Sequence, residues 1–239
     1  MLRIGIPTAS CFESILTPKT LKPSSSQDKY LARLVAEWST GEPMDGGSSA
    51  FMQRGTQMEQ EAADWFSWEY SAEVQRVGFI TDDDMTMGCS PDFLCGDDAG
   101  GEIKCLSAEN HAAALIKPNL DDYRCQIQGG LMISERAYWW RVYYNPLLPP
   151  LALKIERDEP FIALLREAIE EFNVKLAAAK QKLIDMGFSP AGGVAVPSIA
   201  TCPILDMDRK PCGSRDDVRE IDGIFGCASC RKAMAEIFG

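Results

Sequence analysis

The chain has 239 residues, of which 46% are apolar and 25% are charged, and its formal net charge is −11. The apolar content can bury a full core, which excludes a disordered chain, and the length fits one domain with a small appendage. No apolar run is long enough to span a bilayer, and the N-terminus shows no signal-peptide stretch, so we expect a cytoplasmic protein without a membrane partner.

The excess negative charge is concentrated in one stretch. Residues 56–104 carry twelve acidic and two basic side chains, whereas residues 1–55 have a net charge of +1 and residues 105–239 a net charge of −2. At face value an acidic chain argues against a nucleic-acid partner. However, clustered carboxylates either form a solvated surface or bind a divalent cation that offsets their repulsion. The charge alone leaves both interpretations open.

Hydrophobic periodicity predicts a chain that mixes helices and strands. The predicted helices span residues 30–38, 48–70, 121–134 and 159–186. The predicted strands span residues 74–81, 86–95, 102–106, 138–144 and 151–157. The glycine-rich residues 96–101 lie between two strands and are predicted to form a hairpin loop. This order predicts an α/β (α+β) layer fold with a mixed central sheet flanked by helices.

The C-terminal region differs in composition from the rest of the chain. Residues 188–201 are rich in Gly, Pro, Ala and Ser, which is typical of a linker. We therefore expect a main domain at 1–187, a linker at 188–201 and a short Cys-containing tail at 202–239.

The most informative motif is a proline and an aspartate followed by a glutamate and a lysine, with Asp92, Glu102 and Lys104 as its charged members. Residues i and i+2 of a strand point to the same face, so Glu102 and Lys104 should project together, and the hairpin should bring Asp92 beside them. Such oxygen ligands suit Mg²⁺ or Mn²⁺, which can activate water and stabilise charge on a phosphoryl group. The alternative is a hairpin with an incidental surface Glu–Lys pair.

The chain resembles the lambda-type phage alkaline exonucleases of the PD-(D/E)xK nuclease superfamily. The resemblance rests on eight fragments in matching order: RIGIPTAS at 3–10, RGTQMEQEA at 54–62, CSPDFL at 89–94, EIKC at 102–105, QIQ at 126–128, WW at 139–140, YNP at 144–146 and ERDE at 156–159. It implies the PD-(D/E)xK core for residues 1–187, in a bacterial or phage-infected cell.

The resemblance also implies roles for individual residues. Two Mg²⁺ (or Mn²⁺) ions would be bound by Asp92, Glu102, the Ile103 carbonyl and a further carboxylate. Glu59 is preferred for that carboxylate over Glu61, because its spacing from the helix glycine matches the family.

Two further sets of residues receive roles in the same way. Lys104 would serve the attacking water, and Gln126 would help to position it. The 5′-terminal phosphate of the cut strand would be held by Arg3, Ser10 and Ser90.

The activity implied is 5′→3′ degradation of one strand of linear double-stranded DNA to 5′-mononucleotides, in phage-type homologous recombination by single-strand annealing. A homotrimeric ring around DNA and a single-strand annealing protein as partner are implied by the resemblance alone. Two alternatives stay open: an endonuclease of the same superfamily in repair or defence, and a catalytically decayed DNA-binding module.

The nine cysteines fall into two groups. Five are scattered and suit small buried residues in a reducing compartment: Cys11, Cys89, Cys95, Cys105 and Cys125. Four lie in the tail with one C-x-x-C pair, which suits a structural Zn²⁺: Cys202, Cys212, Cys227 and Cys230. Free thiols or disulfides are the alternatives for the tail.

Overall fold

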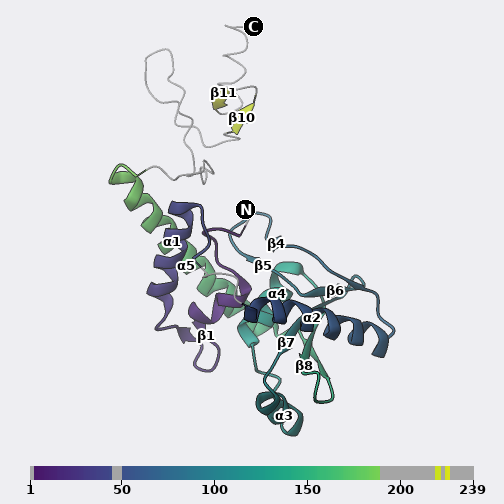
Figure 1. The fold of residues 1–239 in the computed structure, drawn as a ribbon. Helices are drawn as coiled ribbons and strands as arrows, with labels where there is room; N and C mark the ends of the chain where they lie inside the picture. The colour runs from purple at the N-terminus through teal and green to yellow at the C-terminus, as the bar shows by residue number, and fades with distance from the viewer. Residues whose placement is uncertain (1–2, 45–49, 189–218, 222–223, 227–239) are drawn as a thin grey trace, which may run out of the picture. The chain divides into compact units, whose positions relative to one another are not determined.

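The computed structural model describes residues 3–44, 50–188, 219–221 and 224–226 (Figure 1). The chain divides into two compact units, 1–191 and 192–239. The described part of the second unit is an antiparallel hairpin of β10 (Arg219–Ile221) and β11 (Ile224–Gly226). The four tail cysteines of the predicted zinc site lie outside the described residues, as does most of the predicted linker.

The first unit is built on a five-stranded sheet with the strand order β3-β6-β7-β8-β9. Its strands are β3 (Val74–Gln75), β6 (Phe93–Cys95), β7 (Ala99–Cys105), β8 (Tyr138–Tyr144) and β9 (Leu151–Glu156). The central pair β7–β8 is parallel and the other pairs are antiparallel. The predicted mixed central sheet is therefore confirmed.

Helices cover this sheet through two separate hydrophobic clusters. The helices are α1 (Gln27–Thr40), α2 (Ala50–Glu69), α3 (Ala108–Ile116), α4 (Arg124–Ser134) and α5 (Glu159–Asp185), with a 3₁₀ helix η1 (Ala9–Ser14). Ala62 and Phe66 of α2 pack with Ile103 of β7 in one cluster. The other cluster unites η1, α1, α4 and α5 with Trp139 of β8. In Figure 1, α1 and α5 run side by side. Among the helices of the described part, none is long and apolar enough to cross a membrane.

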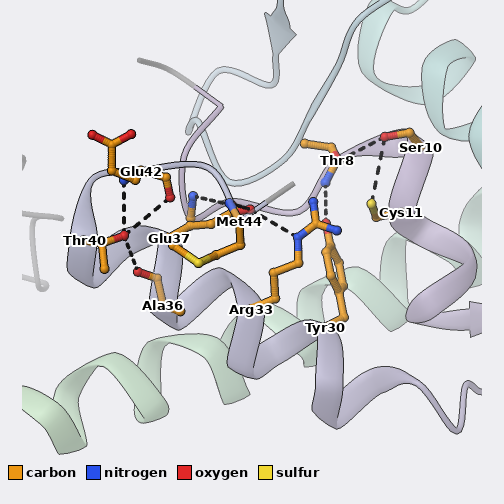
Figure 2. A network of polar contacts seen from close by, with 11 residues as sticks. Thr8, Ser10, Cys11, Tyr30, Arg33, Ala36, Glu37, Thr40, Glu42 and Met44 are labelled. Carbon is orange, nitrogen blue, oxygen red and sulfur yellow. Dashed lines mark hydrogen bonds and ion pairs between the residues drawn. The ribbon is translucent and has the colours of Figure 1, made fainter. Parts of the chain in front are cut away.

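The N-terminal arm (residues 3–8) is fastened to α1 and to a small two-stranded sheet of β4 (Ile80–Thr81) and β5 (Gly88–Cys89). The Gly88 N–H donates to the Pro7 carbonyl at 3.0 Å. Figure 2 shows the polar network of α1, in which the Tyr30 hydroxyl accepts from the Thr8 N–H at 3.0 Å. The buried Glu37 carboxylate accepts from the Gly5 N–H at 3.4 Å and from the Met44 N–H at 3.2 Å.

Two predicted strands are each divided in the structure. Residues 74–81 form β3 and β4, and residues 86–95 form β5 and β6, so each predicted strand contributes to two different sheets. Pro91 lies between β5 and β6, and its missing N–H cannot continue a ladder. The prediction of single strands was wrong here because alternation of apolar residues does not reveal which neighbour a strand will pair with.

The predicted hairpin loop at 96–101 is shorter in the structure, because β7 already begins at Ala99. Gly100 and Gly101 are strand residues that lie beneath aromatic rings. A Cβ added at Gly100 would approach the Trp139 ring to 2.3 Å, and one added at Gly101 would approach the Phe93 ring to 2.1 Å. These glycines therefore mark close approach of large side chains, not a turn.

The remaining differences concern helix ends and two short elements. α1 begins at Gln27 instead of residue 30, and α4 begins at Arg124 instead of residue 121. Helix α3 was not predicted; Ser107 caps it by accepting from the Asn110 N–H at 3.4 Å. A small hairpin of β1 (Leu16–Thr17) and β2 (Lys22–Pro23), which was not predicted, precedes α1. The five scattered cysteines are free, and Cys89 and Cys125 are buried.

Replacing Gly101 by Ala should destabilise the fold, because the new methyl group would overlap the buried Phe93 ring. We expect a loss of about 1–3 kcal/mol in the free energy of unfolding, measured by urea denaturation. The matched control is Gly78→Ala, since nothing lies within 4 Å of a Cβ built there. Equal stability of the two variants would contradict this packing.

Candidate active site

Strand β7 presents two charged side chains on one face. The Lys104 Nζ donates to Glu102 Oε1 at 2.8 Å and to Gln126 Oε1 of α4 at 3.0 Å. Ile103, between them, points to the opposite face and is buried against α2. The alternation of a strand thus anchors β7 by its apolar residue and places Glu102 and Lys104 on the side of α4.

Asp92 is fixed where β6 and β7 part. Its N–H donates to the Gly101 carbonyl at 3.0 Å, and its Oδ2 accepts from the Ile103 N–H at 2.6 Å. The Asp92 carboxylate thus provides the acceptor for the Ile103 N–H, at the point where β6 no longer pairs with β7. The bond sets the Asp92 carboxylate against the backbone that joins Glu102 to Lys104.

Burial disfavours the charged forms of the two carboxylates. Desolvation is the main cause that raises the pKa of Asp92 to about 7, and the charge of Glu102 adds to it. Desolvation also raises the pKa of Glu102, against the opposing effect of the Lys104 ammonium. One lysine therefore does not offset the negative charge that this site would carry at neutral pH.

Glu59 approaches this pair from helix α2. It is half-buried, and its charge contributes to the raised pKa values of both Asp92 and Glu102. The competing candidate Glu61 is exposed and accepts from the Tyr144 hydroxyl at 3.2 Å. The charge of Glu59, and not that of Glu61, thus acts on both carboxylates.

No three His, Cys, Asp or Glu side chains within the described ranges are grouped closely enough to form a ready-made metal site. Asp92 and Glu102 nevertheless fit a divalent cation, because they are buried oxygen ligands whose mutual repulsion a cation would relieve. Mg²⁺ in particular retains several waters and needs few protein ligands.

A cavity of about 180 Å³ adjoins these carboxylates. Its lining includes all three residues predicted to hold a terminal phosphate, together with two of the residues predicted to serve catalysis: Arg3, Ser10, Ser90, Glu102 and Gln126. The arm, η1 and the segment after β5 meet here because the Pro7–Gly88 bond ties the arm to β5. Asp92, Lys104 and Glu59 are not among the lining residues, so Glu102 and Gln126 form the wall that the cavity shares with the carboxylate cluster.

Sequence reasoning missed several residues of this region. Trp139 lines the cavity with a buried indole N–H that has no hydrogen-bond partner within the described structure. Gly130 on α4 lies against its ring, and a Cβ added at this glycine would approach the ring to 3.0 Å. The glycine pair at 129–130 within a predicted helix was the available signal, since helix glycines often mark close packing.

The sulfur and imidazole groups do not suggest another chemistry. Cys89 lines the cavity, but burial raises the pKa of its thiol to about 12, so it is not a thiolate at neutral pH. His111 is the single histidine, and its Nε2 lies 2.8 Å from the Pro149 carbonyl oxygen, away from the cavity lining. The site therefore offers carboxylates, an ammonium and an amide next to the cavity.

Comparisons with known proteins agree with this chemistry. The chain resembles the crystal structure of an alkaline exonuclease (LHK-Exo) from Laribacter hongkongensis, with 29% identity and a TM-score of 0.68 over 77% of this chain and 94% of that one. A structure of LHK-Exo in complex with dAMP matches equally well. A phage-related exonuclease from Haemophilus somnus 129PT shares the fold, with 13% identity and a TM-score of 0.57 over 76% of this chain and 96% of that one.

A search of curated protein sequences found no match. A family model, in contrast, matches residues 1–137, which is more than half of the chain, and it describes the YqaJ-like viral recombinase domain. The matched residues include the arm, β5 to β7 and α4, and hence every side chain of the site described above except that of Trp139. The resemblance to the lambda-type exonucleases is thereby confirmed, and the chain belongs to the YqaJ-like viral recombinase family.

Proposed function

We propose that the chain is a metal-dependent 5′→3′ exonuclease that degrades one strand of linear double-stranded DNA to 5′-mononucleotides. The observation that supports this best is the shared wall of the site. The cavity that Arg3, Ser10 and Ser90 line is also lined by Glu102 and Gln126. These two residues accept the hydrogen bonds of Lys104. A terminal phosphate in the cavity would therefore leave the adjoining phosphodiester beside the carboxylates. The similarity to an alkaline exonuclease supports the exonuclease part of this proposal.

Two Mg²⁺ or Mn²⁺ ions would be held by Asp92, Glu102 and the Ile103 carbonyl, with Glu59 as a further ligand. Bound divalent cations supply Lewis acidity and lower the pKa of water, which is the chemistry that phosphodiester hydrolysis needs. Asp92 is held ready by the Ile103 N–H, and Glu102 by the Lys104 ammonium. These bonds orient one oxygen of each carboxylate and leave the other for a ligand.

Lys104 would position the attacking water. An ammonium has three N–H donors, and two of those on Lys104 are directed to Glu102 and Gln126. The third can donate to the water oxygen or to the phosphoryl oxygen on which charge develops. Gln126 accepts a hydrogen bond from the ammonium on the side of the cavity. It would keep the ammonium between the terminal phosphate and the phosphodiester that is cleaved.

Arg3 and the two serines would select the end of the strand. A guanidinium binds a phosphate with two parallel hydrogen bonds, and hydroxyl groups add short charge-assisted bonds. Arg3 and Ser90 are exposed enough to meet a ligand, and Ser10 is held by Thr8, with 3.3 Å between their hydroxyl oxygens. On the resemblance we also propose a homotrimeric ring and a single-strand annealing protein as partner in phage-type recombination.

The purified chain with Mg²⁺ should degrade linear duplex DNA that carries 5′-phosphates and release 5′-mononucleotides. Cleavage should be slower on 5′-hydroxyl ends, because the cavity residues would lose their charged ligand, and absent in EDTA. Arg3→Ala should remove the preference for the phosphate while leaving activity on 5′-hydroxyl ends. Equal cleavage of closed circular duplex would favour an endonuclease and overturn the proposal.

Replacing Lys104 by Ala should lower kcat by about 10²–10⁴-fold, the usual contribution of a group that acts on the proton transfers or the charge of the transition state. Circular dichroism and the binding of DNA should be unchanged. A matched control is Lys154→Ala, because Lys154 forms a similar pair with Glu156 on β9, with 2.8 Å between Nζ and Oε1. Retained turnover in Lys104→Ala would remove this residue from the mechanism.

The buried carboxylates should also make stability depend on pH. The pKa of Asp92 is about 7 in the folded protein, against an ordinary value of 3.8, so the folded state binds the extra proton. Metal-free protein should therefore lose stability as the pH rises from about 4 through 7. Asp92→Asn should be more stable than wild type at pH 8 and equally stable below pH 4, as measured by thermal denaturation. Added Mg²⁺ should stabilise wild type at pH 8 and leave the variant unchanged.

A further inference from the structure

Tyr123 has an unfavourable backbone conformation directly beside Lys104. It is the N-cap of α4, with φ 58° and ψ 26°, in the left-handed region that aromatic residues seldom adopt. The residue is 39% exposed, and the Lys104 Nζ lies 4.5 Å from the centroid of its ring. Glycine or asparagine would adopt this backbone at lower cost, so the presence of a tyrosine requires an explanation other than the turn itself.

The turn that carries Tyr123 is held rigidly by β8. The buried Arg141 guanidinium donates to the carbonyl oxygens of Asn119, Leu120 and Asp122. The Tyr143 hydroxyl donates to Asp122 Oδ2 at 3.2 Å. In the parallel pairing of β7 and β8, Arg141 lies opposite Glu102 and Tyr143 opposite Lys104. The strand next to the two candidate catalytic residues therefore fixes the turn over one of them.

These contacts surround the ammonium on three sides. Glu102 and Gln126 each accept one of its N–H groups, and the Tyr123 ring covers it from a third direction. The negative face of an aromatic ring attracts a cation without consuming a hydrogen-bond donor. The ring can thus hold the Lys104 side chain in place and leave its remaining N–H for the reaction.

We propose that Tyr123 is a positioning residue that fixes Lys104 for the attack on the phosphodiester, an inference that rests on the proposed function. The strained backbone of Tyr123 places its ring beside Lys104. The hydrogen bonds from Arg141 and Tyr143 hold the turn in this conformation. The contribution of the ring comes from its face. The hydroxyl group of Tyr123 does not contribute.

The test uses Tyr123→Gly and Tyr123→Phe in the full chain, assayed on 5′-phosphorylated linear duplex. Glycine relieves the strained backbone and removes the ring, so the melting temperature should stay close to that of wild type while kcat falls about tenfold with little change in KM. Phenylalanine keeps the face of the ring and should retain near wild-type kcat. Glu135→Gly is the matched control, since Glu135 at the other end of α4 is exposed and has φ 56°.

A second measurement reports on the contact itself. In protein labelled with ¹³C-lysine, the ε-methylene protons of Lys104, identified by their loss in Lys104→Ala, should show an upfield ring-current shift. Tyr123→Gly should remove this shift and Tyr123→Phe should keep it.

The possible results separate the two proposals. Wild-type kcat in Tyr123→Gly, or an unchanged Lys104 shift, overturns the role of Tyr123 alone. Loss of kcat in Tyr123→Phe equal to that in Tyr123→Gly also overturns it, because the hydroxyl would then be the active group. Failure of wild type to cleave linear duplex overturns the proposed function, and the positioning role with it.

Discussion

The site depends on the place where β6 and β7 separate. Strand β6 begins only at Phe93, and beyond it the Asp92 carboxylate accepts a hydrogen bond from the Ile103 N–H of β7. This one bond connects a side chain to the backbone between Glu102 and Lys104. Because Ile103 is locked beneath α2, the three charged residues are held by the packing of an apolar one. The same separation directs Ser90 and Pro91 into the cavity.

This arrangement is unfavourable for the bare protein. Two buried carboxylates with raised pKa values and a single ammonium leave an uncompensated charge, and the surrounding fold must tolerate it. The close packing on both faces of β7 provides that tolerance: Phe93 lies on Gly101 and Trp139 on Gly100. Glycine in the middle of a strand weakens it, but here it lets large rings approach the sheet next to the charged residues.

Sequence reasoning found the parts of the site whose information is local. The i, i+2 spacing of Glu102 and Lys104 predicted a shared face, and the long amphipathic pattern at 159–186 predicted α5 almost to its ends. It failed where the cause lies in a distant segment. The glycines of β7 predicted a turn, because the sequence does not show that the rings of Phe93 and Trp139 pack against them. Tyr123 was assigned to a regular helix because nothing near it in sequence indicates that Arg141 holds its turn.

The distribution of charge constrains how such a site could engage DNA. A net charge of −11, most of which comes from residues 56–104, repels the phosphate backbone and gives little non-specific affinity. Under the proposed function, recognition must therefore come from groups that act at one point. Arg3 in the cavity and bound divalent cations at Asp92 and Glu102 are of that kind, since both act on individual phosphates at short range. An enzyme with this charge pattern would remain on DNA by holding the strand end or by encircling the duplex, and a broadly basic surface would be unnecessary.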